Sequence, residues 1–351
     1  MILMGLLLNR TQRIPYYQKL STKYGFRVLL FGEDTINWQA RTAAGLILSR
    51  GTWTEGTYPL PNAVYNRCYP EKPEVIARLE QFLGEGRVFN TRTLFDKLDV
   101  HQVLTGSAAL RPFLPEAHEL VPEQLAAHLA DGRKWVIKPR RGQSGRNVYL
   151  LEPAGEFVLV TSNINIPLPI PKGEPFLALV ELLQMGEKYV VQEYVQGAVF
   201  SGGVFDVRFV VQKNGRGVWN VAGQLSRVAR EGSFITNQYA SLSYPSRVLS
   251  SFGSAGKRIL ARMGKLARLA AVQLDGPLGR LGEICVDFMV DAEGRPWIIE
   301  VNGKPDKGLF HEFGDEQMLE RIYLTPLTYL RRIGLSAPER GKGVGSTAGN
   351  I

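Results

Sequence analysis

Cysteine is scarce in this 351-residue chain, which contains only Cys68 and Cys285. Two cysteines so far apart exclude the disulfide framework of a small secreted protein, and they favour a reducing, cytoplasmic location. Histidine is scarce as well. The four histidines are scattered along the chain and form no zinc-binding pattern.

Long hydrophobic runs are also missing. The apolar start, residues 1–8, is too short for a transmembrane helix. It lacks the charged start and the longer apolar core of a signal peptide, and polar sequence follows it directly. We interpret it as a buried first strand and expect no membrane partner.

The chain has no excess of acidic residues. Its 42 basic and 33 acidic residues give a formal net charge of +9, which permits an anionic partner. Helix-turn-helix, zinc-finger and RNA-binding signatures are absent, so we rank nucleic acid low. The predicted helix 256–274 has basic residues largely opposite its apolar ones, and a solvated face is the commoner explanation of that pattern.

The first 90 residues predict a small α/β domain. Strand 2–8, helix 15–24 and strand 26–31 follow in the order of a right-handed crossover unit. Residues 52–58 and 63–69 are expected to form an irregular sheet edge and its connection, and residues 73–83 to form a helix. No Gly-x-Gly-x-x-Gly motif occurs, so a dinucleotide site in this half is unsupported.

A hairpin near the C-terminus gathers three oxygen-bearing side chains. Strands 284–290 and 297–301 flank a turn, with Asp287 on the first strand and Glu300 and Asn302 on or just after the second. Residues two apart leave the same face of a strand. Glu300 interrupts an apolar run, where a charge is costly unless it is paired or bound to a metal. The pattern suits Mg²⁺, although a plain surface hairpin is the alternative.

Two lysines and a glycine-containing loop precede this hairpin. Lys97 lies on a predicted helix over 91–103, and Lys138 ends a predicted strand over 135–138. Loop 140–146 then leads to strand 148–151, and its backbone N–H groups could form an anion site. The loop is not a Walker A motif, because the Gly-Lys-Ser/Thr sequence and the following helix are missing. Taken alone, Lys97 is an ordinary exposed lysine and the loop an ordinary turn.

Further elements are predicted from polar and apolar alternation. Strand 205–212 carries Asp206 and Arg208 on one face, and Asn214-Gly215 predicts a hairpin turn after it. The other expectations are a strand over 189–195 that turns polar at its end, loops over 163–171 and 233–245, and helices over 123–130, 176–185 and 318–330.

In this order and spacing, these motifs resemble the ATP-grasp family over roughly residues 91–330. Three stretches are most similar to the YheC/YheD group of that family, described as endospore coat-associated: residues 205–215, residues 233–237, and residues 281–287 together with 300–305.

The resemblance implies a fold that combines α/β and α+β parts. Residues 1–90 would be the N-terminal α/β (pre-ATP-grasp) domain. Residues 91–335 would be the ATP-grasp domain, in which two α+β subdomains (91–195 with the flap, 196–335 with the metal and substrate sites) clamp the nucleotide. Residues 336–351 would be a flexible tail.

The resemblance also implies ATP and Mg²⁺ as cofactors and gives each motif a role. Lys97 and Lys138 match the phosphate-binding lysines, and Asp287, Glu300 and Asn302 match the Mg²⁺ ligands. Loop residues Arg140, Gly142, Ser144 and Gly145 match the flap over the phosphates, and Gln192, Glu193, Tyr194 and Val195 match the strand that reads adenine. Arg208 and Arg227 match catalytic positions near the transferred phosphoryl group and the substrate. Lys304 and Asn237 are assigned to the substrate side.

The implied reaction activates a carboxylate as an acyl phosphate, which an amine or similar nucleophile then attacks. One departure from the family stands out. The loop after Asn237 continues as 238–243 without the family's usual Gly-Gly run. The alternative function is therefore a spore-coat protein that keeps the fold and ATP binding with little or no ligase activity. Neither the acid nor the acceptor can be named from the sequence, and spore-coat proteins would be the further partners.

Overall fold

The computed structural model describes residues 2–142, 145–163 and 166–336. The chain divides into two compact units. The first comprises Met1–Thr93, Asn214–Val218 and Tyr323–Ile351, and the second comprises Leu94–Lys213 and Trp219–Ile322. The first break lies close to the boundary predicted at residue 90. The residues from 323 onward group with the N-terminal unit, so the predicted domain range 91–335 stays a prediction.

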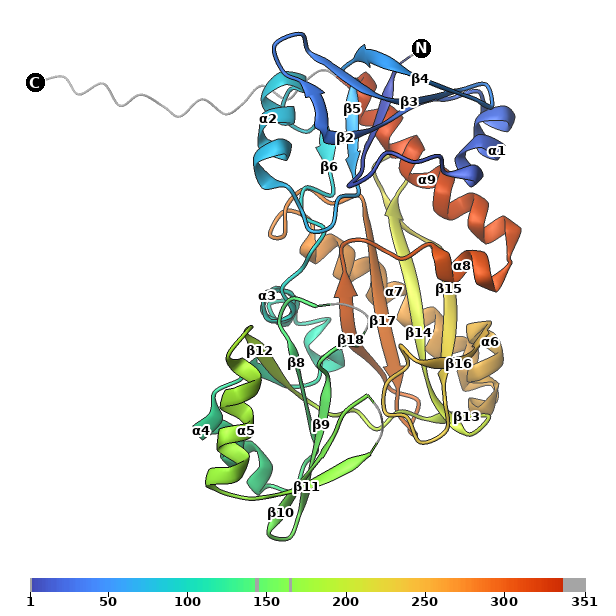
Figure 1. Ribbon diagram of the computed structural model, residues 1–351. Coiled ribbons are helices and arrows are strands. Elements are labelled where there is room, and N and C mark those ends of the chain that lie inside the picture. Colours follow the sequence, from blue (N-terminus) through green and yellow to red (C-terminus); the bar gives the residue numbers. More distant parts are fainter. Residues whose placement is uncertain (1, 143–144, 164–165, 337–351) are drawn as a thin grey trace, which may run out of the picture. The chain divides into compact units, whose positions relative to one another are not determined.

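The first unit is built on one sheet in the order β4-β3-β2-β1-β5-β6 (Figure 1). Parallel pairing of β1 with β2 confirms the predicted crossover unit. Residues 52–58 lie in the outer strand β4, which confirms the predicted sheet edge. Residues 63–66 form an interior strand with all four residues buried, so their assignment to the irregular edge and its connection was wrong. The strands are β1 (Met4–Leu7), β2 (Arg27–Asn37), β3 (Thr42–Ser49), β4 (Thr52–Pro59), β5 (Ala63–Asn66) and β6 (Val88–Phe89).

The two helices of this N-terminal segment occupy the predicted ranges, α1 at Pro15–Tyr24 and α2 at Pro73–Leu83. Both begin with proline, whose fixed φ suits the first turn of a helix. Helix α1 ends at Gly25, which adopts φ +66°, a conformation that glycine reaches without a Cβ penalty. Ile76 and Leu79 of α2 pack into the core with Leu29, Phe31 and Val64 of the sheet.

The second unit contains a sheet in the order β11-β10-β9-β8-β12-β7, which we call the flap-side sheet. Leu129 of α4 and Val180 of α5 pack with Trp135 and Ile137 of β8 on one of its faces. The strands are β7 (Ala117–Glu119), β8 (Trp135–Pro139), β9 (Tyr149–Ala154), β10 (Phe157–Thr161), β11 (Pro167–Pro171) and β12 (Tyr189–Glu193). The helices are α3 (Lys97–Thr105), η1 (Arg111–Phe113), α4 (Pro122–Ala130) and α5 (Glu174–Gln184). The prediction of a loop over 163–171 was wrong, because β11 forms there.

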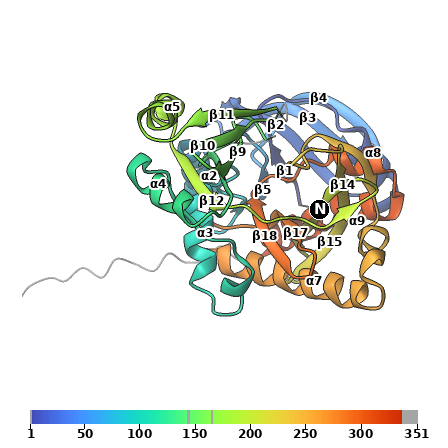
Figure 2. The same ribbon diagram turned by 90° about the horizontal axis from the view of Figure 1, so that it is seen from below.

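The other sheet of this unit has the order β16-β15-β14-β17-β18, and we call it the acidic sheet. Helix α7 packs on one of its faces (Figure 2), with Met263 and Ala267 against Phe209 and Phe288. Residues 239–243 form its edge strand β16 and not the predicted loop. The strands are β13 (Val199–Phe200), which pairs with β14 alone, β14 (Gly203–Lys213), β15 (Trp219–Ala229), β16 (Tyr239–Ser243), β17 (Glu283–Val290) and β18 (Pro296–Asn302).

The remaining helices are α6 (Pro245–Val248), η2 (Leu249–Phe252), α7 (Ala255–Leu274), α8 (Gly308–Phe313) and α9 (Glu316–Leu335). The division between the two units falls within α9. Across the part of the chain that is described, none of the helices combines the length and apolar character needed to cross a bilayer.

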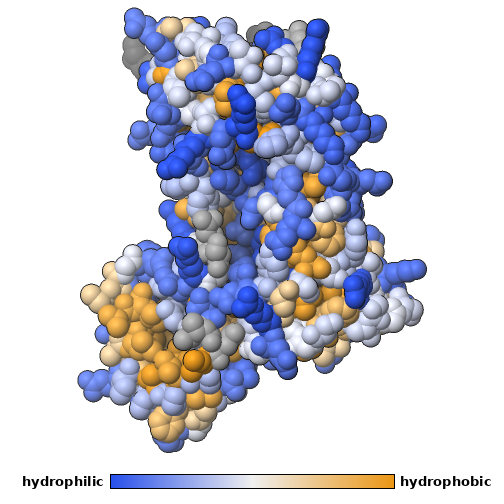
Figure 3. Space-filling view, turned by 45° about the vertical axis from the view of Figure 1, so that its right-hand side comes forward, coloured by the Kyte–Doolittle hydropathy of each residue, from blue (hydrophilic) through white to orange (hydrophobic). Residues whose placement is uncertain are grey.

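The face of the molecule in Figure 3 is largely polar and carries several hydrophobic areas. Several large apolar side chains are exposed between β10 and the end of α5: Phe157, Ile166, Leu168, Leu182 and Met185. Such exposed apolar patches commonly mark interaction surfaces.

Candidate functional site

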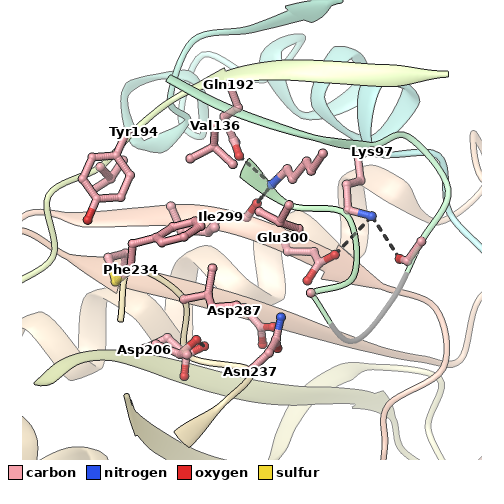
Figure 4. Close-up of a pocket in the computed structure, with 18 of the residues that line it drawn as sticks. Lys97, Val136, Gln192, Tyr194, Asp206, Phe234, Asn237, Asp287, Ile299 and Glu300 are labelled. Carbon is pink, nitrogen blue, oxygen red and sulfur yellow. Dashed lines mark hydrogen bonds and ion pairs between the residues drawn. The ribbon is translucent and has the colours of Figure 1, made fainter. Parts of the chain in front are cut away.

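A pocket lies within the second unit, between one face of the flap-side sheet and one face of the acidic sheet (Figure 4). The structure brings most of the predicted site residues together in its lining. They are Lys97, Lys138, Gly142, Gly145, Gln192, Glu193, Tyr194, Val195, Arg227, Asn237, Asp287 and Glu300. Ser144 lies outside the described residues.

Lys138 stands on the flap-side wall because side chains alternate along β8. Trp135 and Ile137 enter the core with α4 and α5, so Val136 and Lys138 face the pocket. The Nζ atom of Lys138 donates to Oε1 of Gln192 at 2.6 Å and to the carbonyl of Ile299 at 3.4 Å. Burial, assisted by the positive charge of Lys97, lowers the pKa of Lys138 to about 8, against the opposing pull of Glu300 and Asp287.

Lys97 is the first residue of α3, so this helix begins six residues later than predicted. Asp96 caps it by accepting from the N–H groups of residues 98 and 99. The Lys97 ammonium donates to the carbonyl of Gly142 at 3.0 Å and lies 3.4 Å from Oε1 of Glu300. Lys97 is therefore a pocket residue and not an ordinary exposed helix lysine.

Glu300 reaches the pocket through a β-bulge. Asp287 pairs with Glu300 and Phe288 pairs with Ile298, so Ile299 is the extra residue of β18. A bulge re-aims the side chains next to it, and here the consecutive residues Ile299 and Glu300 both line the pocket. Burial by itself would raise the pKa of Glu300, but Lys97 and Lys138 hold it below its usual value.

Asp287 lies at the centre of a buried charge network on the acidic sheet. Arg208 grips its two carboxylate oxygens at 2.7 and 2.6 Å, and Nη2 of Arg227 lies 3.1 Å from Oδ2. Burial opposes ionisation of this carboxyl, yet the two guanidinium groups lower its pKa. The same ion pairs raise the pKa of Arg208 against the effect of burial. Asp287 is thus charged, with its oxygens already engaged.

Asp206 extends this network to the next strand. Its carboxylate accepts from Nε of Arg227 at 3.1 Å and from the hydroxyl of Thr236 at 2.5 Å, and Asn237 Oδ1 accepts from Arg227 at 3.0 Å. Asp206 and Thr236 both line the pocket, although neither was predicted to have a role there. The signal for Asp206 was its alternation with Arg208 in an apolar strand. The signal for Thr236 was its place in the stretch 233–237, which carries part of the family resemblance.

The flap loop approaches the acidic sheet at Gly145. This residue adopts φ +67°, and a Cβ placed there would lie 2.8 Å from Nδ2 of Asn237. A larger residue at position 145 would be strained by the positive φ and would displace the end of the Asn237 side chain.

Four predicted site residues lie outside the pocket lining: Arg140, Arg208, Asn302 and Lys304. Arg140 binds Asp96 at 3.0 Å, Asp99 at 3.3 Å and Glu119 at 3.0 Å. Its guanidinium therefore fixes the start of α3. Asn302 stands opposite Cys285 on β17. Burial of Cys285 raises the pKa of its thiol to about 12, so this cysteine is an unreactive thiol.

The pocket has an apolar end and a charged end. Figure 4 shows Tyr194 and Phe234 at one end and Lys97 with Glu300 toward the other. Val136 and Met289 add apolar lining. An elongated ligand with an aromatic ring at one end and several negative charges at the other would match this arrangement.

The acid groups fit Mg²⁺ only as a site completed by a ligand. No group of three or more Asp, Glu, His or Cys side chains among the described residues could hold a metal by itself. Asp287 and Glu300 share one face of the β17–β18 pair. Mg²⁺ commonly takes one or two carboxylates together with phosphate oxygens and waters, so this donor set suits a nucleotide-dependent ion.

Residues 85–333 match the family described as YheC/D-like ATP-grasp. The chain belongs to this ATP-grasp family. The endospore coat-associated proteins YheD and YheC of Bacillus subtilis strain 168 are 26% and 24% identical to it. Each alignment covers 93% of this chain, with 76% of YheD and 94% of YheC.

Solved structures agree on the fold. A RimK-domain ATP-grasp protein from Sphaerobacter thermophilus superposes with a TM-score of 0.51 and 18% identity, over 92% of this chain and 99% of that one. N5-carboxyaminoimidazole synthetase from Staphylococcus aureus gives 0.55 and 10%, over 96% and 78%. The predicted fold class, α/β and α+β with an ATP-grasp architecture, is confirmed. ATP-grasp proteins in general bind ATP and Mg²⁺.

Proposed function

We propose that this chain is an ATP- and Mg²⁺-dependent ligase that activates a carboxylate as an acyl phosphate for attack by an amine or similar nucleophile. The observation that carries the proposal is the convergence of Lys97, Lys138, the 192–195 strand end and two carboxylates in one pocket with an apolar and a charged end. The family membership and the ligase-type structural neighbours support it.

The charged end is suited to phosphoryl transfer. This reaction depends on positioning and on neutralising the charge of the phosphate oxygens, and it requires no side-chain nucleophile. In the proposal Lys97 and Lys138 hold the phosphates, and Gly142 and Gly145 cover them from the flap. Arg140 keeps α3, and thus Lys97, in place through its bond to Asp96.

The apolar end is suited to the adenine ring. In the proposal Val136, Met289 and Phe234 pack against its faces, and the backbone of Glu193, Tyr194 and Val195 reads its edge. Gln192 has a second task, since its side-chain oxygen holds the Lys138 ammonium at 2.6 Å.

The proposed Mg²⁺ ligands are Asp287, Glu300 and Asn302. When bound with ATP, the ion would neutralise phosphate charge. The substrate side is assigned to Arg227 and Asn237, which line the pocket, together with Arg208 and Lys304 beside it. In the proposed chemistry a carboxylate oxygen bonds to the γ-phosphorus and ADP leaves, after which the nucleophile displaces phosphate from the acyl carbon.

The proposal is tested by thermal denaturation with and without Mg·ATP, followed by assays of ADP release with pools of carboxylic acids and amines. Nucleotide binding to the folded state must raise the melting temperature. We expect a rise with Mg·ATP and ADP release that needs both an acid and an amine. No rise with any nucleotide would show that the site assignment is wrong.

A second candidate is a spore-coat structural or interaction protein that binds ATP with little or no ligase activity. Two observations favour it: the names of the Bacillus subtilis relatives, and residues 239–243, which form the edge strand β16 next to the substrate-side residues. A melting shift with Mg·ATP, without ADP release for any acid and amine pool, would select this candidate.

A further inference from the structure

Among the sheet-edge strands of the described residues, β4 and β11 have contrasting chemistry. Strand β4 is the outer strand of the first unit's sheet (Figure 2), and β11 is the outer strand of the flap-side sheet. A sheet edge presents unpaired N–H and C=O groups, and proteins usually protect it with proline, charge or a short strand. These two edges differ in that protection.

The β11 edge is closed by proline. Pro167, Pro169 and Pro171 alternate with Leu168 and Ile170 in pairing with β10. Proline has no N–H, so the donors that hold this strand to β10 come from the two residues between the prolines. The backbone positions that face away from β10 are the three prolines. The free edge of β11 therefore offers no N–H donor over its whole length.

The β4 edge is open. Pairing with β3 is continuous from Thr52 to Pro59, and the N–H of Leu60 continues it by donating to Arg41 at 2.9 Å. Backbone groups alternate in direction along a strand, so even-numbered residues face β3 and the odd-numbered ones face outward. Pro59 agrees with this parity, because its nitrogen needs no partner. The outward N–H groups belong to Trp53, Glu55 and Thr57.

No residue of β4 is buried, and the strand has a single charged residue, Glu55. It pairs with β3 alone among the described strands. Its start is fixed by the two-residue turn Arg50-Gly51, with φ values of 49° and 80°. Strand β4 is thus a rigid, nearly uncharged template for another strand.

We propose that β4 pairs antiparallel with β4 of a second copy of this chain, which joins two sheets across a two-fold axis. Identical antiparallel strands related by such an axis pair a residue with itself or with one an even number of positions away, because side chains alternate between faces. The axis therefore lies midway between the two copies of one residue of β4.

Full overlap of the two eight-residue strands places the axis at Glu55 or at Gly56, and charge decides between these two registers. With the axis at Glu55, the two Glu55 carboxylates stand directly opposite each other, which is destabilising. With the axis at Gly56, Glu55 faces Thr57 of the other copy and Trp53 faces Pro59. The outward N–H groups of Glu55 and Thr57 then meet outward carbonyls. The other edge of the sheet, β6, has two residues, so pairing closes at a dimer and does not propagate.

Mass measurement by light scattering over a range of concentrations tests the pairing in the full-length protein. We expect a dimer for the wild type. Thr57→Pro removes an outward N–H and leaves the bonds to β3 intact, so it should raise the dimer dissociation constant about tenfold or more. Thr57→Ala keeps the N–H and should dimerise like the wild type. A wild type that is monomeric at every concentration, or a Thr57→Pro variant that dimerises equally well, would overturn the proposal.

Disulfide formation tests the register and does not depend on the proline variant folding. Gly56 would face its symmetry mate in a pair without hydrogen bonds, with about 4.5 Å between Cα atoms, which a disulfide can span. Gly56→Cys should therefore crosslink two chains, and Glu55→Cys should not. Cys68 and Cys285 are buried and give little background. Crosslinking of Glu55→Cys alone, or of neither variant, would contradict the proposed pairing.

Discussion

The two walls of the pocket treat buried charge differently. The flap-side wall buries Lys138 against two uncharged oxygens, those of Gln192 and the Ile299 carbonyl. On the acidic sheet, Asp206, Arg208, Arg227 and Asp287 are all buried, and each contacts an opposite charge on a neighbouring strand. A buried charge is costly unless it is paired. The charge of Lys138 on the flap-side wall would therefore be stabilised by a bound anion, whereas the buried charges of the acidic sheet are already paired with one another.

This difference in charge pairing also distinguishes Asp287 from Glu300, the two carboxylates that the sequence analysis grouped as metal ligands. Asp287 is held by two guanidinium groups. Among the described residues, the one ion pair of Glu300 is that with Lys97, at 3.4 Å, and its side chain is 21% exposed. We infer that the main role of Asp287 is to stabilise the sheet, and that the carboxylate of Glu300 is more available than that of Asp287 to bind a metal ion.

Asp287→Ala should destabilise the protein by about 3–5 kcal/mol, because it leaves two buried guanidinium groups without their shared partner. Urea denaturation without nucleotide measures this change. The matched variant Glu300→Ala should cost much less in the same assay. Equal costs for the two variants would remove the proposed distinction between the carboxylates.

Lys138→Met should weaken ATP binding about tenfold to a hundredfold, because a charge-assisted hydrogen bond to phosphate is worth about 1.5–3 kcal/mol. Calorimetric titration with Mg·ATP provides the measurement. Methionine removes a buried charge but leaves Oε1 of Gln192 without its donor, so the two effects oppose each other and the unfolding free energy should change by no more than about 1–3 kcal/mol. Unchanged affinity would show that Lys138 does not contact the phosphates.

Glu300→Gln should change the unfolding free energy by no more than about 1 kcal/mol, since its ion pair with Lys97 is partly exposed. It should, however, reduce the gain in ATP affinity that Mg²⁺ provides. Titrations with ATP at several Mg²⁺ concentrations check this. In wild type, Mg²⁺ without nucleotide should give no melting shift, and a large shift with Mg²⁺ alone would contradict a nucleotide-completed site.

The smallest effect concerns pH. The pKa of Lys138 is lowered to about 8, so its ammonium is lost from the free protein as pH rises through that value. ATP affinity should fall by less than about tenfold between roughly pH 7 and 9, because phosphate binding favours the charged form. Lys138→Met should abolish this part of the pH dependence.

Loss of the Lys138 proton has the opposite effect on the unfolding free energy. The folded-state pKa of Lys138 lies below the ordinary lysine value of 10.5, so the unfolded chain binds more protons between about pH 8 and 10.5. The contribution of Lys138 to the unfolding free energy should therefore rise with pH in this window. Comparison of wild type with Lys138→Met by urea denaturation isolates it.

Local signals predicted the elements and much of the pocket. Proline at the first helical turn and glycine after the last gave α1 and α2 their limits. Alternation along β8 placed Lys138 on the face opposite the core. Errors fell where local signals were weak: β11 alternates apolar residues with prolines, and β16 has no strong apolar pattern, so both were expected to be loops. Whether such a segment forms a strand or a loop depends on its pairing with a neighbouring strand.

The sequence predicted the fold class, the family and most of the charged residues of the pocket, because motifs in a fixed order carry the family resemblance. Which of the pocket's charged residues pair with one another depends on the tertiary structure. The bulge at Ile299, the grip of two arginines on Asp287 and the diversion of Arg140 to Asp96 depend on which strands and helices become neighbours. Long-range pairing also placed β5 in the interior of its sheet, and no local sequence pattern contains that information.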